Sequence, residues 1–158
     1  MKSATEKLPV IMVSYFDTSV LMAAILQDHE LYVLANTTLN RALRSGTAVS
    51  TTLHTYAELY NNLTKPKKRA NLLSPEQAAN LLINNVGKAV QLIELSKADY
   101  EAAIERCRRL NLVSAIIYDA LHYQAALKAG AEVLYTDNTK DFTRLQLPDE
   151  TLRIEGIR

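Results

Sequence analysis

The stretch from Val10 to Asp17, VIMVSYFD, decides the fold, because it is almost continuously apolar and ends on a carboxylate. A parallel strand that is buried on both faces has this composition, whereas a strand with one solvated face alternates apolar and polar residues. Burying a charged carboxylate is costly unless something pairs with it. Asp17 therefore indicates a functional group at the carboxyl end of a strand, where open α/β folds place their ligands.

Strand-like and helix-like patterns alternate along the rest of the chain. We expect strands at Val10–Phe16, Thr47–Thr51, Ala89–Leu95, Val133–Thr136 and, as a last edge strand, Leu152–Ile157. We expect helices at Val20–Leu26, Asp28–Ser45, Leu53–Thr64, Ser74–Val86, Asp99–Leu110 and Tyr118–Ala129. This alternation predicts a three-layer α/β/α fold with a mostly parallel central sheet.

Length and composition are those of one ordinary globular unit. The chain has 158 residues, and we expect residues 1–158 to form a single domain. The formal net charge of +1 is too small to indicate a nucleic-acid partner, although a local basic patch would matter more than the total. No uncharged apolar stretch approaches the ~20 residues of a membrane span, and the first residues do not resemble a signal peptide. We therefore expect a cytoplasmic protein without a membrane partner.

The only cysteine, Cys107, excludes an intrachain disulfide and a cysteine-based zinc site. It lies on the apolar stripe of a predicted helix, which favours a core position over a reactive thiol. Its neighbours Arg106, Arg108 and Arg109 are expected on the solvated face of that helix.

Three further acids occupy positions that a metal site requires. Asp137 follows the short run Val133–Thr136, while Glu58 and Asp119 occupy or open helical patterns. Carboxylates gathered at one sheet edge repel each other unless a divalent cation offsets their charge. Because hard cations prefer oxygen ligands, the pattern favours Mg²⁺ or Mn²⁺.

The segments that carry these acids resemble, in the same order, the four motifs of the PIN domain, a metal-dependent ribonuclease fold. They are Tyr15–Leu21 (YFDTSVL), Tyr56–Tyr60 (YAELY), Ile117–His122 (IYDALH) and Thr136–Phe142 (TDNTKDF). An Asp after a strand is common, so the signal comes from four motifs in order. The resemblance covers the chain from Val10 onward. The compact length is similar to VapC-type toxins, the nuclease halves of bacterial and archaeal toxin–antitoxin pairs.

The resemblance implies an endoribonuclease that cleaves RNA phosphodiester bonds. Asp17, Glu58 and Asp119 would be the central metal ligands, and Asp137 would be a fourth ligand or would orient the attacking water. A toxin also implies a small antitoxin protein, whose apolar helix would fill a groove beside the acids. The helical patterns Leu31–Leu43 and Leu53–Leu63 would supply surface for that partner or for a homodimer.

Several polar residues are candidates for accessory roles. Side chains that could bind a phosphate or a metal-bound water are those of Thr18, Ser19, Thr136 and Asp141. Side chains that could grip the RNA backbone are those of Lys65, Lys67, Lys68 and Arg69, with a solubilising loop as the alternative.

Each acid also has a purely structural interpretation. Asp17 and Asp119 can cap helices, Glu58 can be a solvated helix residue, and Asp137 can be part of a turn. His122, on the same helix face as Asp119, is expected to be a satisfied or partly exposed histidine with no required role. The tyrosines are expected in the core or at interfaces rather than as base-stacking groups.

Two other functions remain open. A catalytically silent PIN-like domain would only bind RNA or a protein, and the presence of all four acids argues against it. A haloacid-dehalogenase-like phosphatase is suggested by Phe16 and Asp17, but its motif requires a second acid where this chain has Ser19.

Overall fold

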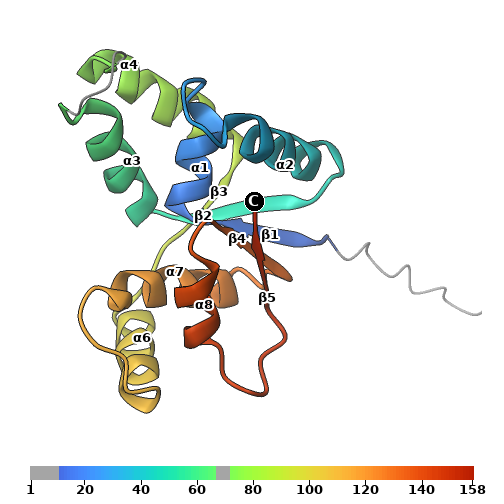
Figure 1. Ribbon diagram of the computed structural model, residues 1–158, viewed down its shortest axis with the longest axis vertical. Helices are drawn as coiled ribbons and strands as arrows, with labels where there is room; N and C mark the ends of the chain where they lie inside the picture. The colour runs from blue at the N-terminus through green and yellow to red at the C-terminus, as the bar shows by residue number, and fades with distance from the viewer. Residues whose placement is uncertain (1–10, 67–71) are drawn as a thin grey trace, which may run out of the picture.

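A parallel sheet divides the molecule into two helical layers (Figure 1). The computed structural model describes residues 11–66 and 72–158, and within them five strands form one sheet in the order β3-β2-β1-β4-β5. All four neighbouring pairs are parallel. The strands are β1 Val13–Phe16, β2 Ala48–Thr52, β3 Gln91–Ile93, β4 Val133–Thr136 and β5 Arg153–Gly156. The predicted α/β/α class is confirmed.

Helices cover both faces of this sheet (Figure 1). One layer contains α1 Thr18–Ile25, α2 Tyr32–Arg44, α3 His54–Thr64, α4 Pro75–Asn80, the π-helical segment η1 Leu81–Val86 and the short α5 Gly87–Ala89. The other layer contains α6 Lys97–Arg109, α7 Ile116–Lys128 and α8 Thr139–Leu145. None of the helices in the described ranges is long and apolar enough to cross a membrane.

The central strand β1 contributes to the hydrophobic cores of both layers. Phe16 belongs to the core formed with α1, α2 and α3, while Tyr15 belongs to the core formed with α6, α7 and α8. Both side chains are fully buried, and burying one side chain of this size stabilises the fold by about 1.5–3 kcal/mol. Burial on both faces explains why the sequence of this strand does not alternate.

The order of the strands creates a crevice beside β1. Strands β2 and β3 lie on one side of β1, and strands β4 and β5, which come later in the chain, lie on its other side. In open parallel sheets, ligands bind outside the carboxyl ends of the strands at such a reversal. The Asp17 N–H donates to the Tyr135 carbonyl at 3.1 Å, so Asp17 lies directly at this point.

Several predicted boundaries were wrong, and the largest differences lie at the helix expected from Asp28 and after the helix expected from Ser74. The helix expected from Asp28 begins at Tyr32, since residues 27–31 form turns in which His29 Nδ1 accepts the Leu31 N–H. The helix from Ser74 starts with the expected capping box but passes through η1 and α5 to Ala89, which delays β3 to Gln91. Helix α8 was not predicted.

The expectation of a solvated Arg106 was also wrong. Arg106 is only 8% exposed, and its guanidinium makes two hydrogen bonds with Glu150 at 2.8 and 2.6 Å. The same group lies 4.5 Å from the centroid of the Tyr123 ring. Cys107 is buried as predicted, and burial raises the pKa of its thiol, which argues against a reactive cysteine.

Candidate active site

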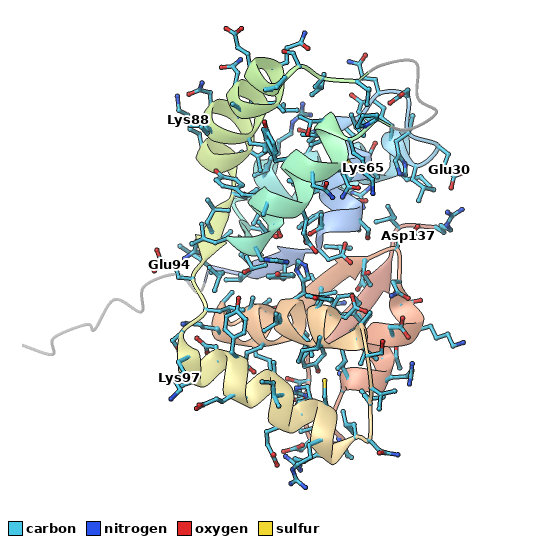
Figure 2. All side chains as sticks on the ribbon, turned by 90° about the vertical axis from the view of Figure 1, so that its left-hand side faces the viewer. Glu30, Lys65, Lys88, Glu94, Lys97 and Asp137 are labelled. Carbon is cyan, nitrogen blue, oxygen red and sulfur yellow. The ribbon has the colours of Figure 1, made fainter. Side chains whose placement is uncertain are left out.

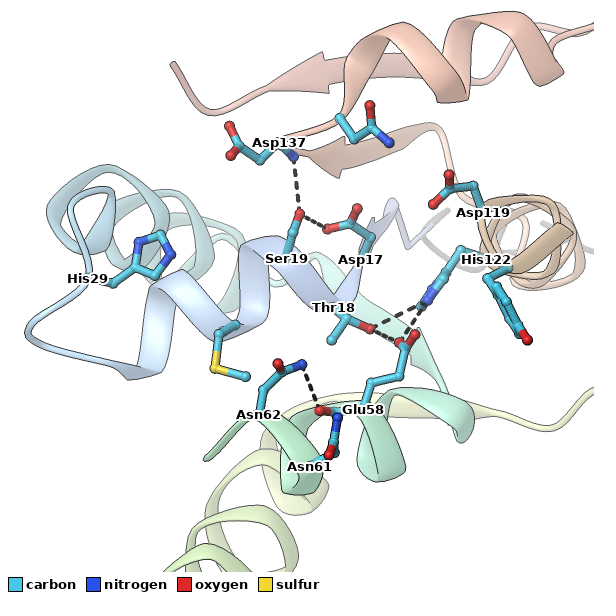
Figure 3. A pocket seen from close by; sticks show the side chains of 13 residues that line it. Asp17, Thr18, Ser19, His29, Glu58, Asn61, Asn62, Asp119, His122 and Asp137 are labelled. Carbon is cyan, nitrogen blue, oxygen red and sulfur yellow. Dashed lines mark hydrogen bonds and ion pairs between the residues drawn. The ribbon is translucent and has the colours of Figure 1, made fainter. Parts of the chain in front are cut away.

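The four predicted acids line one cleft at the carboxyl edge of the sheet (Figure 3). Its volume is about 530 Å³, and it opens where β1 and β4 end. Asp17 follows β1, Asp137 follows β4, Glu58 comes from α3 and Asp119 comes from the first turn of α7. Segments that are far apart in the sequence thus bring their carboxylates to one place.

Asp17 is held rigidly at the base of this cleft. Its Oδ1 accepts hydrogen bonds from the Ser19 hydroxyl at 2.6 Å and the Val20 N–H at 3.1 Å, and its Oδ2 accepts from Thr136 at 2.5 Å. Burial raises the pKa of Asp17, while the hydrogen bonds from Ser19 and Thr136 oppose that rise. Asp17 is therefore both the N-cap of α1 and a site carboxylate with a fixed orientation.

The Asp119 carboxylate is held by fewer hydrogen bonds than that of Asp17, and negatively charged side chains lie near it. Burial raises the pKa of Asp119 to about 6, with further contributions from the charges of Asp141, Asp17 and Glu58, while His122 opposes the rise. Within the described part of the chain, no hydrogen-bond donor contributes to this balance. A carboxylate with free acceptor positions and anionic neighbours is well suited to a cation.

Glu58 differs from Asp119, because its neighbours favour the ionised form of its carboxylate. Its Oε2 accepts hydrogen bonds from the Thr18 hydroxyl and, at 3.1 Å, from His122 Nε2, while His54 Nε2 lies 3.7 Å from its Oε1. Burial would raise the pKa of Glu58, but the hydrogen bonds from His122 and Thr18 outweigh it and lower the pKa. Glu58 is therefore ionised and directed by its neighbours.

Asp137 lies at the outer rim of the cleft. Its carboxylate pairs with the Arg158 guanidinium at 3.1 Å, and Arg158 also pairs with Glu30 at 2.8 Å. Figure 2 shows Asp137 and Glu30 at the same margin of the molecule. The Asp137 N–H donates to Ser19 Oγ at 3.2 Å, so the backbone at this position supports the residue that holds Asp17.

The accessory candidates divide into those at the cleft and those away from it. Thr18 and Ser19 line the cleft, and Thr136 lies behind Asp17. Asp141 is not among the lining residues, and its carboxylate accepts hydrogen bonds from Asn138 and Arg144 at 3.0 and 3.1 Å. Lys65, labelled in Figure 2, is the C-cap of α3 and is not among the residues that line the cleft. Lys67, Lys68 and Arg69 lie outside the described residues.

The contacts of two residues at this cleft were not foreseen from the sequence. His122 is the satisfied histidine that was expected, since it is only 4% exposed, but its bond to Glu58 was not predicted. Its spacing of three residues from Asp119 on one helix was the available signal. Tyr118 was expected in the core or at an interface, yet it is 55% exposed and lines the cleft, with its ring parallel to that of His54.

The donors at this site fit a hard divalent cation by their chemistry. Asp17, Glu58 and Asp119 offer carboxylate oxygens in one cleft, and the charges of Asp17 and Glu58 add to the effect of burial in raising the pKa of Asp119. Across residues 11–66 and 72–158, no three acidic, histidine or cysteine side chains are close enough to form a ready-made ion site. The carboxylates must therefore approach one another, or act through water, to share an ion.

Comparison with known proteins places the chain in a family. The sequence model of the PIN domain matches residues 14–146. A search of curated proteins found no match. Three solved structures share the fold with TM-scores of 0.65, 0.63 and 0.62 at 22%, 19% and 18% sequence identity.

The first is VapBC2 from Rickettsia felis bound to a DNA fragment from their promoter, with 92% of this chain and 98% of that chain covered. The second is VapBC-1 from nontypeable Haemophilus influenzae, with the same coverages of 92% and 98%. The third is VapC20 of Mycobacterium tuberculosis, described as a Sarcin-Ricin loop cleaving toxin, with 82% and 93% covered. With a family match over residues 14–146 and a fold shared with VapC-type structures, this chain belongs to the PIN domain family.

Proposed function

We propose that this protein is a metal-dependent endoribonuclease and the toxin of a type II toxin–antitoxin pair. The observation that carries the proposal is the meeting of Asp17, Glu58 and Asp119 in one cleft of a PIN domain. Nucleases of this family generally use divalent metal ions. The carboxylate donors make Mg²⁺ or Mn²⁺ the expected ion.

In this proposal the protein's own groups perform distinct tasks. Asp17, Glu58 and Asp119 hold the ion, and Asp137 binds it from the rim or orients the attacking water. An ion held by these carboxylates would supply Lewis-acid chemistry to the phosphodiester, to a coordinated water and to the leaving oxygen. The hydrogen bonds from Ser19 and Thr136 keep Asp17 in one orientation, so that little reorganisation is needed during the reaction.

The substrate we propose is single-stranded RNA. The exposed Tyr118 at the cleft offers an aromatic face on which an unpaired base can stack. The basic run formed by Lys65, Lys67, Lys68 and Arg69 would hold the backbone through contacts that do not depend on sequence. An acidic cleft needs such cationic help, because its carboxylates repel phosphate when no metal is bound.

The acids can be tested by replacing each with its neutral isostere. Asp17→Asn and Asp119→Asn should each reduce the rate of RNA cleavage by more than about 100-fold, since even outer-shell partners of metal ligands contribute 10–100-fold. Asp149→Asn is the matched control, because Asp149 is exposed and is not among the residues that line the cleft. Circular dichroism should show that all three variants remain folded.

Full activity in the folded Asp17→Asn and Asp119→Asn variants would reject these acids as the site. A wild-type protein that binds RNA or a protein but cleaves nothing would instead favour the silent PIN-like alternative. The phosphatase alternative loses its basis, because Ser19 stands where that motif needs an acid and donates its hydroxyl to Asp17.

We further propose a small antitoxin as the partner. An apolar groove of about 370 Å³ lies between α1, α2 and the η1–α5 segment, lined in part by Leu21, Ile25, Leu39, Leu81 and Val86. An amphipathic helix is the natural occupant of such a groove. Two of the similar structures are VapBC assemblies, which supports this choice.

The same helix α2 exposes Val33 and Leu34 to solvent, which supports a contact with the antitoxin or a second copy in a homodimer. Co-purification from the native operon should recover the antitoxin. Harmless overexpression of an active, lone monomer would contradict the toxin assignment.

A further inference from the structure

A buried hydrogen-bonded chain connects the central strand to Glu58. The Tyr15 hydroxyl lies 2.8 Å from His122 Nδ1, and His122 Nε2 lies 3.1 Å from Glu58 Oε2. Tyr15 is fully buried in β1, and His122 is 4% exposed in α7. Glu58 belongs to α3 in the opposite helical layer, so His122 links the two layers at the cleft (Figure 3).

The direction of these hydrogen bonds follows from the chemistry of the two end groups. Burial raises the pKa of Tyr15 well above its usual value, so its hydroxyl keeps its proton and can donate to Nδ1. The Glu58 carboxylate can only accept. A single neutral tautomer of His122 satisfies both neighbours, with Nδ1 accepting from Tyr15 and the Nε2–H donating to Glu58.

The Glu58 side chain needs such support more than Asp17 does. Asp17 receives three hydrogen bonds from its own surroundings and has a short side chain. Glu58 has one more rotatable bond and reaches into the cleft from a helix surface. Its side chain is 29% exposed, and the orientation of its carboxylate depends on His122 and Thr18.

We propose that His122, itself oriented by Tyr15, is a positioning residue that holds Glu58 in the metal-binding cleft beside Asp17 and Asp119. The inference rests on the proposed function, because it assigns His122 a role in preparing the same site. His122 is an addition to the four acids. It would act through Glu58 and would not contact the ion. Outer-shell partners of this kind typically change metal affinity by 10–100-fold.

The test is calorimetric titration of Mn²⁺ into RNA-free protein. His122→Leu removes the contacts with Tyr15, Glu58 and Thr18 and should weaken binding by about 10–100-fold. His122→Gln retains an amide donor for Glu58 and a carbonyl acceptor for Tyr15, and it should recover most of that loss. Tyr15→Phe leaves His122 in place but unanchored, and it should weaken binding by a smaller factor.

The matched control is Tyr123→Phe. Tyr123 follows His122 in α7, is fully buried and donates a 2.8 Å hydrogen bond to Glu150, away from the cleft. Like Tyr15→Phe, the Tyr123→Phe substitution removes a buried hydroxyl, but it should leave the Mn²⁺ affinity unchanged. Melting temperatures of all variants then separate general destabilisation from loss of metal affinity.

A double-mutant cycle shows whether His122 acts through Glu58. In a Glu58→Gln background, His122→Leu should cause no further loss of Mn²⁺ affinity. Nitrogen-15 NMR of the wild-type protein should find the proton of the His122 ring on Nε2, with Nδ1 bare.

Equal Mn²⁺ affinity of the wild type and a folded His122→Leu variant would overturn the positioning role and leave the proposed function intact. Tighter binding by that variant would overturn it as well, because His122 would then be holding Glu58 away from the ion. A wild type that binds no Mn²⁺ would overturn both proposals.

Discussion

At the residue scale, the most informative side chains have two roles. Asp17 caps α1 and also lies in the cleft, so its structural interpretation is confirmed and its position is compatible with the proposed functional one. Sequence spacing located Asp17 because a carboxylate after an apolar strand is unusual. Sequence spacing could not predict that His122 and Arg106 are buried, because each pairs with a residue distant in the chain. His122 pairs with Glu58, and Arg106 pairs with Glu150.

Asp119 has a stability effect whose sign can be worked out. Its pKa is about 6 in the folded protein, against 3.8 for an unperturbed Asp, so the folded state binds more protons between these values. Stability therefore rises as the pH falls from about 6 toward 4, and ionised Asp119 weakens the metal-free fold at neutral pH.

Asp119→Asn should accordingly raise the metal-free melting temperature at pH 7 by about 2–4 °C, a shift that corresponds to about 1 kcal/mol in a chain of this size. The modest figure allows for solvent screening of a half-buried group. The difference from the wild type should shrink toward pH 4. Thermal denaturation in chelator between pH 4 and 7.5 measures it, with Asp149→Asn as the control, and a pH-independent difference would contradict the assignment.

At the element scale, long periodic segments were easier to predict than short or irregular ones. The helices α3, α6 and α7 lie within two residues of their expected ends, because each presents an apolar face over several turns. Helix α8 has only seven residues, and its signal is the fully buried pair Phe142 and Leu145. The π-helical segment η1 keeps the apolar pattern of an ordinary helix, so composition cannot reveal it.

Gly87, where η1 passes into α5, is required by packing rather than by backbone conformation. A Cβ there would lie 1.8 Å from the Tyr56 hydroxyl of α3. Gly87→Ala should therefore lower the free energy of unfolding by about 1 kcal/mol, because the half-buried Tyr56 side chain must shift away, although alanine is the better helix former.

The matched rescue is Tyr56→Phe, which removes the clashing oxygen and leaves contacts no closer than 3.2 Å. The Gly87→Ala/Tyr56→Phe double variant should regain most of the lost stability in urea denaturation. Equal instability of the single and double variants would show that the tight contact between α3 and α5 is not the cause.

At the scale of the whole molecule, alternation of strands and helices was enough to predict a parallel sheet with two helical layers. The strand order β3-β2-β1-β4-β5 was not predictable from the residues, because it depends on which face each connection crosses. That strand order determines where the cleft forms, because it places β1 next to β4 and so brings Asp17 and Asp137 to the same edge of the sheet. The resemblance to PIN domains supplied what pattern alone could not, namely which acids belong together.

The central claim is that these acids serve a divalent cation in RNA cleavage. The most direct measurement is the rate at which the purified protein cleaves single-stranded RNA with Mg²⁺ or Mn²⁺, in excess chelator, and after the ion is restored. We expect cleavage to stop in chelator and to return with the ion, because the proposed ligands are hard oxygens that cannot support the reaction alone. Undiminished cleavage in excess chelator would contradict the account.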